Sequence, residues 1–387
     1  MAYGGGVSVI FSDPRGPDAA APDLSGRPEA REAFLAAHGL ADAAREPVAG
    51  DASTRSYTRL RPAAGPPLIL MDAPPAAESA VASAQATPSE RIALGYNAMA
   101  RLAGGRVDAF AALAGWLRAR GLSAPEVHAL DAAQGFAVLE DLGADLFRDR
   151  LDAGADPGEV YGQAVDVLVA LHAEPPLAAV PVPGGGEWAL PPYDSLALQL
   201  GADLFLQWWP ALTGTAGFPD DARAEWSALW APVLARGESG ATVFTHRDYH
   251  AENLLWLPER AGPARVGLLD FQDAVRGHPA WDLFHLLQDA RRDVPEALEA
   301  RMVQRYLDAR PRLDPEGFRA DYAALGALNA ARILGPVFAR QITAFGREKY
   351  RAFLPRTWRA LERNLRHPSM RGLQAWFDRW VPPEHRA

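Results

Sequence analysis

The chain has 387 residues, with 39 Lys or Arg against 48 Asp or Glu, which gives a net charge of −9 at pH 7. This balance disfavours nucleic-acid binding driven by bulk charge, and the lack of cysteine excludes disulfides, thiolate metal sites and cysteine nucleophiles. No apolar run approaches the roughly 18 residues of a membrane span, and the first residues lack the basic region of a signal peptide. We therefore expect a cytoplasmic protein with no membrane partner and no obligate protein partner.

The first third of the chain predicts a small β-rich lobe. Residues 1–28 are rich in Gly, Pro, Ala and Asp, which is typical of a flexible tail. A short amphipathic helix is expected at 29–38, strands at 56–61 and 68–71, and a strand pair at 126–130 and 136–140. Helical patterns at 89–103 and 108–120 separate them. The predicted lobe spans 29–140, and the Ala/Pro/Ser-rich start of segment 73–106 marks an insertion.

The rest of the chain predicts a larger helical lobe. A connector at 141–143 leads into residues 144–387, with helical periodicity at about 144–152, 157–173, 193–210, 221–235, 280–291, 294–309, 315–343 and 346–365 and a last turn near 370–379. One interruption, 242–271, has apolar runs at 254–257 and 266–269 around a Pro/Gly turn, which predicts a β-hairpin. The pattern favours an α+β fold of two lobes, and a cleft between lobes is a common small-molecule site.

This interruption also contains the residues that point to a reaction. His246, Arg247 and Asp248, followed by Asn253, have the H-R-D-x-x-x-x-N spacing of a kinase catalytic loop, and Asp270 ends the second hairpin strand. Phosphoryl transfer needs a carboxylate beside the acceptor hydroxyl and oxygen ligands for Mg²⁺. We predict Asp248 as the catalytic base and Asn253 and Asp270 as metal ligands. An ordinary surface loop would not combine all these features.

The motifs H-R-D-Y-H-x-x-N-L-L, L-L-D-F-Q-D-A and W-D-L at 281–283 resemble the aminoglycoside phosphotransferase/choline kinase family, which has the protein-kinase-like fold. Within this family, residues 50–57, 71–75, 140–143 and 270–274 are most similar to kinases of the anomeric hydroxyl of N-acetylmuramate and N-acetylglucosamine. The resemblance covers about residues 30–365. It implies a Mg-ATP-dependent kinase that acts on a small sugar in cell-wall recycling.

The resemblance also implies roles for further residues. Residues 50–56 would form a loop over the ATP phosphates, with contacts from Ser53, Thr54 and Arg55. The connector would be the hinge that binds adenine, at Glu140 and Leu142. His246 and Asp282 would support the catalytic loop, Asp282 by accepting hydrogen bonds from its backbone. His250 could reach substrate or pack behind the loop, and we favour packing.

The sequence departs from the kinase pattern at the third strand, where kinases have a lysine that holds the α- and β-phosphates. Lys349 is the only lysine of this chain, and Met71 occupies the strand position. Arg55 and Arg59 are the candidates to replace it, because a guanidinium binds phosphate in a bidentate way. A solvated strand or loop arginine is an equally good interpretation of each.

The acceptor side of the site is less defined. Asp273 could contact substrate or a second metal, and the ring of Trp208 could stack on a sugar. Arg332 and Arg340 lie eight residues apart on one predicted helix and could bind an acidic substrate. Asp273 could instead cap the following segment, Trp208 could pack in the core, and the two arginines could be ordinary helix-surface residues. Two alternatives to a sugar kinase stay open: a phosphotransferase for an aminoglycoside, choline or another amino-alcohol, and a nucleotide-binding pseudokinase scaffold, which the missing lysine suggests.

Overall fold

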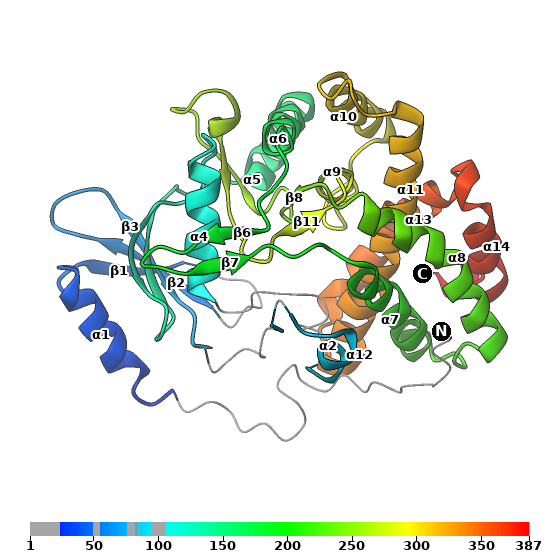
Figure 1. Ribbon diagram of the computed structural model, residues 1–387, viewed down its shortest axis with the longest axis horizontal. Helices are drawn as coiled ribbons and strands as arrows, with labels where there is room; N and C mark the ends of the chain where they lie inside the picture. Colours follow the sequence, from blue (N-terminus) through cyan, green and yellow to red (C-terminus); the bar gives the residue numbers. More distant parts are fainter. Residues whose placement is uncertain (1–23, 49–54, 76–81, 84, 95–105, 387) are drawn as a thin grey trace. The chain divides into compact units, whose positions relative to one another are not determined.

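The computed structural model describes residues 24–48, 55–75, 82–83, 85–94 and 106–386. The chain divides into two compact units, each described by itself here (Figure 1). Unit 1 comprises residues 1–112, 126–141 and 182–186, and unit 2 comprises 113–125, 142–181 and 187–387. Ser53 and Thr54 lie outside the described residues, as does much of the predicted insertion.

Unit 1 is built on a five-stranded antiparallel sheet with the strand order β1-β2-β3-β5-β4 (Figure 1). Its strands are β1 (Ala44–Val48), β2 (Ser56–Arg61), β3 (Leu68–Asp72), β4 (Val127–Asp131) and β5 (Phe136–Glu140). The predicted strands are confirmed to within a residue or two at each end. The sequence pattern did not predict β1, which contains Pro47 and forms an edge of the sheet, where the missing N–H is tolerated.

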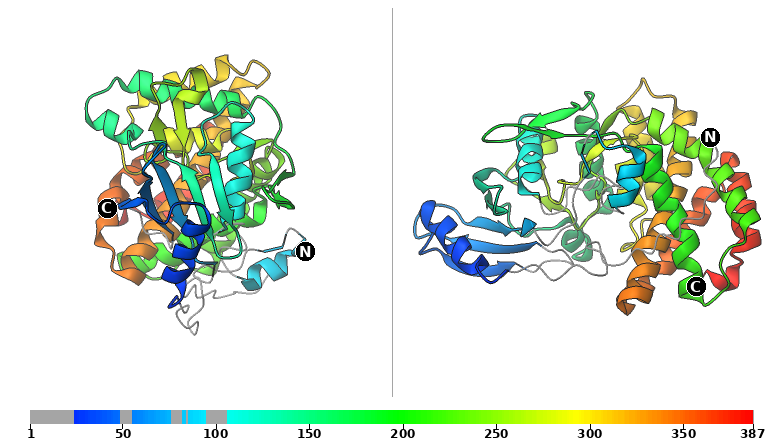
Figure 2. Two further views of the ribbon diagram at one scale, coloured as in Figure 1. Left: turned by 90° about the vertical axis from the view of Figure 1, so that its left-hand side faces the viewer. Right: turned by 60° about the horizontal axis from the view of Figure 1, so that its bottom comes forward.

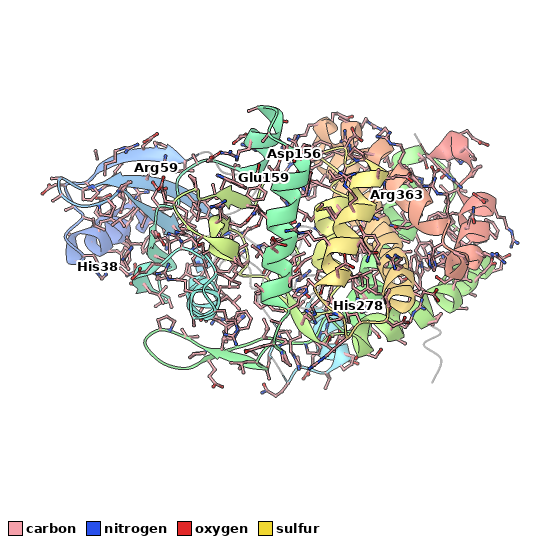
Figure 3. All side chains as sticks on the ribbon, turned by 90° about the horizontal axis from the view of Figure 1, so that it is seen from above. His38, Arg59, Asp156, Glu159, His278 and Arg363 are labelled. Atoms are coloured by element: carbon pink, nitrogen blue, oxygen red, sulfur yellow. The ribbon has the colours of Figure 1, made fainter. Side chains whose placement is uncertain are left out.

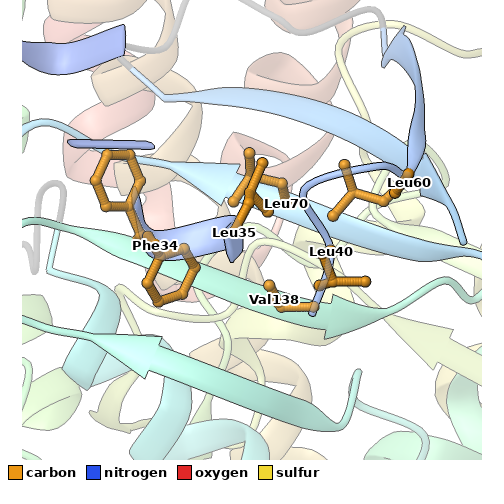
Figure 4. Close-up of a cluster of buried hydrophobic side chains, with 8 residues drawn as sticks. Phe34, Leu35, Leu40, Leu60, Leu70 and Val138 are labelled. Carbon is orange, nitrogen blue, oxygen red and sulfur yellow. The ribbon is translucent and has the colours of Figure 1, made fainter. Parts of the chain in front are cut away.

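One helix covers a face of this sheet and closes its core. Helix α1 (Arg27–Ala37) buries Phe34 and Leu35 against Leu60 of β2, Leu70 of β3 and Val138 of β5 (Figure 4). The neighbouring strands present these side chains on the same face because Leu70 pairs with Val138 in the register. Full burial of a side chain of this size stabilises the fold by about 1.5–3 kcal/mol. The helix begins within the predicted tail.

The helices that follow belong mainly to unit 2. They are α2 (Pro88–Leu94), in unit 1; α4 (Val107–Arg118), which crosses the boundary; and α5 (Phe147–Asp152), α6 (Pro157–Leu171), α7 (Ser195–Thr213), α8 (Asp220–Ser239), α9 (Trp281–Leu287), α10 (Glu296–Asp308), α11 (Pro315–Arg332), α12 (Arg340–Phe345), α13 (Leu354–Leu365) and α14 (Arg371–Trp380). The prediction of a mainly helical segment after residue 143 is confirmed. Figure 2 shows these helices from two further sides.

Local sequence signals set several helix starts. At α6, Asp156 precedes Pro157, and its carboxylate accepts hydrogen bonds from the backbone N–H groups of Gly158 and Glu159 (Figure 3). Asp314 caps α11 in the same way, again just before a proline. The proline needs no hydrogen bond at the first helical position, and the carboxylate satisfies amides that would otherwise lack partners.

The long helical stretch 315–345 is not regular throughout. A π-helical segment, Ile333–Ala339, separates α11 from α12, where the sequence pattern predicts one continuous helix to 343. Gly335 lies in this segment directly against the backbone of α7: a Cβ there would be 2.6 Å from Cα of Phe205. The segment thus forms where two helices approach as closely as glycine allows. By length and hydropathy the stretch could cross a membrane, but 83% of its most apolar window is buried, as in a core helix.

Unit 2 also holds three short strand pairs. β9 (Leu254–Trp256) and β10 (Val266–Leu268) form the predicted hairpin, with the 3-10 turn Gly262–Arg265 before the second strand. β8 (Val243–Thr245) pairs with β11 (Val275–Gly277), and β6 (Ala179–Pro181) pairs with β7 (Glu187–Ala189). The strands β6 and β7 were not predicted, and their region was expected to be part of a helical lobe. Strands of three residues are too short for an alternating pattern to identify.

Candidate active site

The 246–253 loop leaves the end of β8 and leads into β9, so both of its ends are fixed by strands. In the β9–β10 hairpin Leu254 pairs with Leu268, and one step further the Leu269 N–H donates to the carbonyl oxygen of Asn253 at 3.0 Å. Asp270 follows Leu269 directly. The hairpin register therefore brings the predicted metal ligands Asn253 and Asp270 to the same end of the ladder.

Asp282, at the start of α9, holds the beginning of the loop. Its two carboxylate oxygens accept hydrogen bonds from the backbone N–H groups of His246, at 2.7 Å, and Arg247, at 2.9 Å. Arg247 has a left-handed backbone with φ of 76°, which is unusual outside glycine and requires such support. Burial raises the pKa of Asp282 to about 7, although the two amides favour its charged form.

His246 connects the loop to the strand that ends at Asp270. Its Nε2 lies 2.9 Å from the carbonyl oxygen of Leu269, and its Nδ1 accepts a hydrogen bond from the Asp248 N–H at 3.3 Å. Burial lowers its pKa to about 4, so the ring is neutral at pH 7 and carries its proton on Nε2. This single side chain fixes the position of the Asp248 backbone relative to Leu269.

The Asp248 carboxylate is the candidate base of the loop. Its side chain is 45% exposed, so it can reach a ligand, and Oδ1 lies 3.1 Å from Nε2 of His250. Burial alone would raise the pKa of Asp248, but the charge and hydrogen bond of His250, with the charge of Arg291, hold that pKa well below its usual value. Asp248 is ionised at neutral pH and can accept a proton from a hydroxyl.

For His250 we favoured packing over substrate contact, and the structure places its buried ring against the Asp248 carboxylate. Its ring is 4% exposed, and its Nδ1 accepts the backbone N–H of Glu252 at 3.3 Å. Nε2 carries a proton in the charged ring and, with Nδ1 accepting from Glu252, in the neutral ring too, so it donates to Asp248 in both states. Burial lowers the pKa of His250, yet the neighbouring Asp248 carboxylate raises it above the ordinary value overall. The one signal in the sequence was a second histidine two residues after the aspartate.

The two predicted metal ligands suit a hard divalent cation. Asn253 donates from Nδ2 to the backbone carbonyl oxygen of Asp248 at 2.9 Å and also faces its carboxylate, at 3.3 Å, so a cation would be held through the amide oxygen. Asp270 has a left-handed backbone with φ of 59°, and its Oδ1 accepts a hydrogen bond from Nε2 of Gln272 at 2.8 Å. One amide and one carboxylate, completed by water and phosphate oxygens, are a common Mg²⁺ set.

In the part of the chain that the structure describes, no group of three His, Asp or Glu side chains could hold a metal. Any cation at this loop would therefore depend on the amide of Asn253, the carboxylate of Asp270 and oxygens that water or a ligand brings. Gln272, 2% exposed, stands where protein kinases have the glycine of their D-F-G motif and instead contacts the metal-ligand candidate directly.

The candidate nucleotide residues of unit 1 have defined places on the sheet. Arg59 lies on β2 and is labelled in Figure 3. Its guanidinium donates to the carboxylate of Asp141 in the connector, from Nε at 2.5 Å and from Nη2 at 3.3 Å. Met71 is buried on β3, and Arg55 lies just before β2. The Glu140 carboxylate, at the end of β5, accepts the Glu126 N–H at 3.1 Å. Thus Arg59 and Glu140 already have polar partners.

The remaining candidates lie in unit 2. Leu142 is half-buried, and Arg247 donates from Nη1 to the backbone carbonyl oxygen of Asp273 at 3.4 Å. Trp208 is half-buried on α7, whereas its neighbour Trp209 is buried among Phe205, Trp358 and other rings. Arg340 begins α12, with its guanidinium carbon 5.3 Å from the centre of the Phe345 ring. None of the contacts described above joins Trp208 or Arg340 to the 246–253 loop.

A cavity of about 530 Å³ adjoins the loop within unit 2. Ala251 and Glu252 of the loop line it, together with four arginines: Arg148, Arg291, Arg292 and Arg356. None of these arginines was singled out from the sequence, because they come from α5, the segment after α9 and α13, which are far apart in the chain. A cavity of this size can hold a small molecule.

A family model described as the phosphotransferase enzyme family matches residues 44–315, which is more than half of the chain. The chain belongs to this phosphotransferase family. Its match begins at β1 and includes the 246–253 loop, the β9–β10 hairpin and Asp282. The aminoglycoside phosphotransferase-like character expected from the motifs is thereby confirmed.

Two relatives of this phosphotransferase are similar over most of their length. An N-acetylmuramate/N-acetylglucosamine kinase of Caulobacter vibrioides is 54% identical over 362 residues, which cover 94% of this chain and 99% of that protein. A protein of the same name from Pseudomonas aeruginosa is 29% identical and covers 82% of each chain. Among solved structures, the GDP complex of a mutant aminoglycoside 2'-phosphotransferase-IIIa is 11% identical with a TM-score of 0.53, covering 87% of this chain and 98% of that one.

The structural match supports the fold alone, and it confirms the α+β, protein-kinase-like class that the motifs predicted. For a phosphotransferase, the geometry of the 246–253 loop supplies three things: an ionised carboxylate open to solvent, an amide and a carboxylate suited to a divalent cation, and a rigid backbone that holds them. These are the requirements for moving a phosphoryl group to a hydroxyl.

Proposed function

We propose that this phosphotransferase transfers the γ-phosphoryl group of ATP, bound with Mg²⁺, to the anomeric hydroxyl of N-acetylmuramate or N-acetylglucosamine in the cytoplasm, as part of cell-wall sugar recycling. The observation that carries the proposal is the hydrogen-bonded set of Asp248, His250 and Asn253. The relative from Caulobacter vibrioides, 54% identical and of nearly equal length, supports the choice of acceptor.

In this mechanism each residue has a separate task. Asp248 accepts the proton of the sugar hydroxyl as the hydroxyl oxygen bonds to the γ-phosphorus; the bond from that phosphorus to the β–γ bridging oxygen breaks, and ADP leaves. The low pKa of Asp248 keeps its carboxylate ionised at neutral pH. Asn253 and Asp270 would hold Mg²⁺, which neutralises charge on the phosphates when it is bound. His246 and Asp282 keep the loop rigid, so that little reorganisation is needed during the reaction.

The nucleotide contacts belong to the proposal as well. We assign the phosphates to Ser53, Thr54 and Arg55, and the adenine to the backbone at Glu140 and Leu142. Arg59 can contribute to phosphate binding only if its ion pair with Asp141 opens, because that pair engages its Nε and Nη2. Trp208, Asp273 and Arg340 stay as acceptor-side candidates. The net charge of −9 favours a small-molecule partner over a nucleic acid.

The test is product detection with the purified protein, Mg²⁺ and ATP, over a panel of sugars and amino-alcohols, read by mass spectrometry. The proposal expects a new anomeric phosphate on N-acetylmuramate or N-acetylglucosamine. Asp248→Asn should lower kcat by about 10²–10⁴-fold and leave the protein folded by circular dichroism, although loss of the charge that pairs with His250 lowers the thermal unfolding midpoint. Asp166→Asn, which changes a partly exposed carboxylate on α6 paired with Arg305, is the matched control and should stay active.

Three results would contradict the proposal. Full activity of Asp248→Asn would show that another group acts as the base. Product only on an aminoglycoside or choline would assign the enzyme to an amino-alcohol acceptor. Stabilisation by Mg-ATP without turnover on any member of the panel would indicate a nucleotide-binding scaffold.

A further inference from the structure

The cavity beside the 246–253 loop, called the arginine pocket below, has an unusual lining. Besides its four arginines it has four carboxylates, from Asp152, Glu252, Asp289 and Asp293, and only Ala251 and Phe353 add apolar surface. An adenine ring requires apolar walls on its faces, which this pocket does not offer. Hydroxyl and carboxylate groups, in contrast, find many donors and acceptors here. The lining therefore suits a polar acceptor rather than the base of a nucleotide.

The pocket adjoins the candidate base. Glu252 is part of the 246–253 loop, its backbone N–H donates to Nδ1 of His250, and the same ring contacts Asp248. Arg291, on the segment after α9, is near enough to Asp248 for its charge to affect that carboxylate. A sugar bound in this pocket would therefore lie beside the residues that contact and position Asp248.

Arg291 is held less tightly than Arg356, another cation of the pocket. Arg356 donates to both oxygens of Asp293, at 2.9 and 2.7 Å, and from Nη1 to the carbonyl oxygen of Ala290 at 2.8 Å. Arg291 instead has looser ion pairs, from Nε to Glu252 at 3.2 Å and from Nη1 to Asp289 at 3.5 Å, and its side chain is 35% exposed. Arg291 can therefore turn to a new anionic partner at a smaller cost than Arg356 can.

We propose that the arginine pocket binds the acceptor sugar and that Arg291 binds the carboxylate of an acidic sugar by exchanging its contact with Glu252. This assignment rests on the proposed function and extends it to acceptor specificity. With a neutral sugar, Arg291 keeps its pair with Glu252, so its charge stays partnered. With an acidic sugar, the substrate carboxylate takes that place. One pocket can thus accept both kinds of sugar.

The test compares kcat/KM for N-acetylmuramate, which carries a carboxylate, with kcat/KM for N-acetylglucosamine, which does not. Arg291→Gln should lower the ratio of the two values by about tenfold or more, as expected for the loss of a charge-assisted hydrogen bond. Arg291→Lys should keep part of the ratio. Any effect of Arg291 on Asp248 changes both values equally and cancels in the ratio. Arg305→Gln, which breaks an exposed pair with Asp166, is the matched control and should leave the ratio unchanged.

A second measurement needs no variant and covers the case that Arg291→Gln does not fold. Wild-type enzyme is given N-acetylmuramate with its carboxylate converted to the neutral amide. The proposal expects a lower kcat/KM for the amide than for the acid. An unchanged ratio in Arg291→Gln, or an amide used as well as the acid, overturns the assignment of Arg291. Activity of the wild type on neither sugar overturns the proposed function instead.

Discussion

At the scale of single residues, the Asp248–His250 pair sets the pH range in which the Asp248 carboxylate is ionised. Nε2 of His250 donates its proton to the Asp248 carboxylate, which must stay ionised for catalysis. The His250 ring is buried, so water has little access to this hydrogen bond. This pair makes the protonation state of Asp248 depend on one neighbouring side chain. The pH dependence of turnover should therefore report on His250.

Replacing His250 should move the acid limb of the kcat/KM–pH profile. His250→Leu removes the hydrogen bond and charge that lower the pKa of Asp248, so the limb should shift to higher pH, by about one to two units for a bond of this kind. His250→Gln can still donate a hydrogen bond and should recover part of the shift. A profile that keeps its shape while falling equally at all pH values would show that His250 has only a packing role.

The spacing of residues predicted part of this site. H-R-D with Asn253 and a strand-end Asp270 could be read from the sequence because the reaction fixes those residue types at those separations. The partner of Asp248 could not, because the tautomer of His250 depends on a backbone amide at Glu252 that only the folded loop brings to it. Arg291 was missed for a related reason: it lies more than forty residues after Asp248.

At the scale of elements, the π-helical segment 333–339 shows where packing overrides helix propensity. The apolar pattern of 315–343 predicted the position of a helical stretch correctly. It did not predict the change to π-helical hydrogen bonding at 333–339, because the spacing of apolar residues does not show how closely a neighbouring helix approaches. The β9–β10 hairpin, in contrast, was predicted because two apolar runs surround a clear turn.

Gly335→Ala should destabilise the protein. The new methyl would lie 2.6 Å from Cα of Phe205, so α7 and the π-helical segment would have to separate, at a cost of about 1–3 kcal/mol. Gly115→Ala is the matched control: it is an exposed helical glycine of α4 with nothing within 4 Å of the added methyl, and it should gain about 0.5–1 kcal/mol. Urea unfolding measures both, and the same change of stability in the two variants would contradict the packing argument.

At the scale of the whole molecule, the sequence indicated two parts but not how the chain is shared between them. The boundary between Asp141 and Leu142 falls within the predicted connector. Residues 113–125, however, belong to unit 2 and residues 182–186 to unit 1, so the chain crosses the boundary more than once. Reading the chain from end to end cannot show such exchanges, because they depend on contacts between distant segments.

Buried histidines should make the folded state sensitive to acid. Burial lowers the pKa of His172 to about 3 and that of His246 to about 4, from an ordinary value near 6.5. The unfolded chain thus binds these protons at a higher pH than the folded one. Their contribution to stability is complete above about pH 6.5 and is lost as the pH falls toward 3, by at most about 1.4 kcal/mol per pH unit for each histidine.

Urea unfolding at several pH values between about 7.5 and 5 should show this decline. His172→Gln keeps a side chain that can bond to the Tyr306 hydroxyl, which lies 2.8 Å from Nδ1, but it does not titrate and should give a shallower slope. His38→Gln, which replaces an exposed histidine at the C-cap of α1, is the control and should keep the wild-type slope. Identical slopes in wild type and His172→Gln would exclude His172 as a cause.

The single lysine has a practical consequence. Lys349 is exposed on the 3-10 turn Glu348–Phe353, with its Nζ 5.3 Å from the centre of the Tyr350 ring, and the basic side chains of the arginine pocket are guanidinium groups. Amine-reactive dyes and biotin esters would therefore find one reactive side chain, Lys349, besides the α-amino group, and would leave those arginines untouched. With the α-amino group blocked, tethering through Lys349 would attach every molecule to a surface in the same orientation, and a lysine-specific protease would have one site to cut.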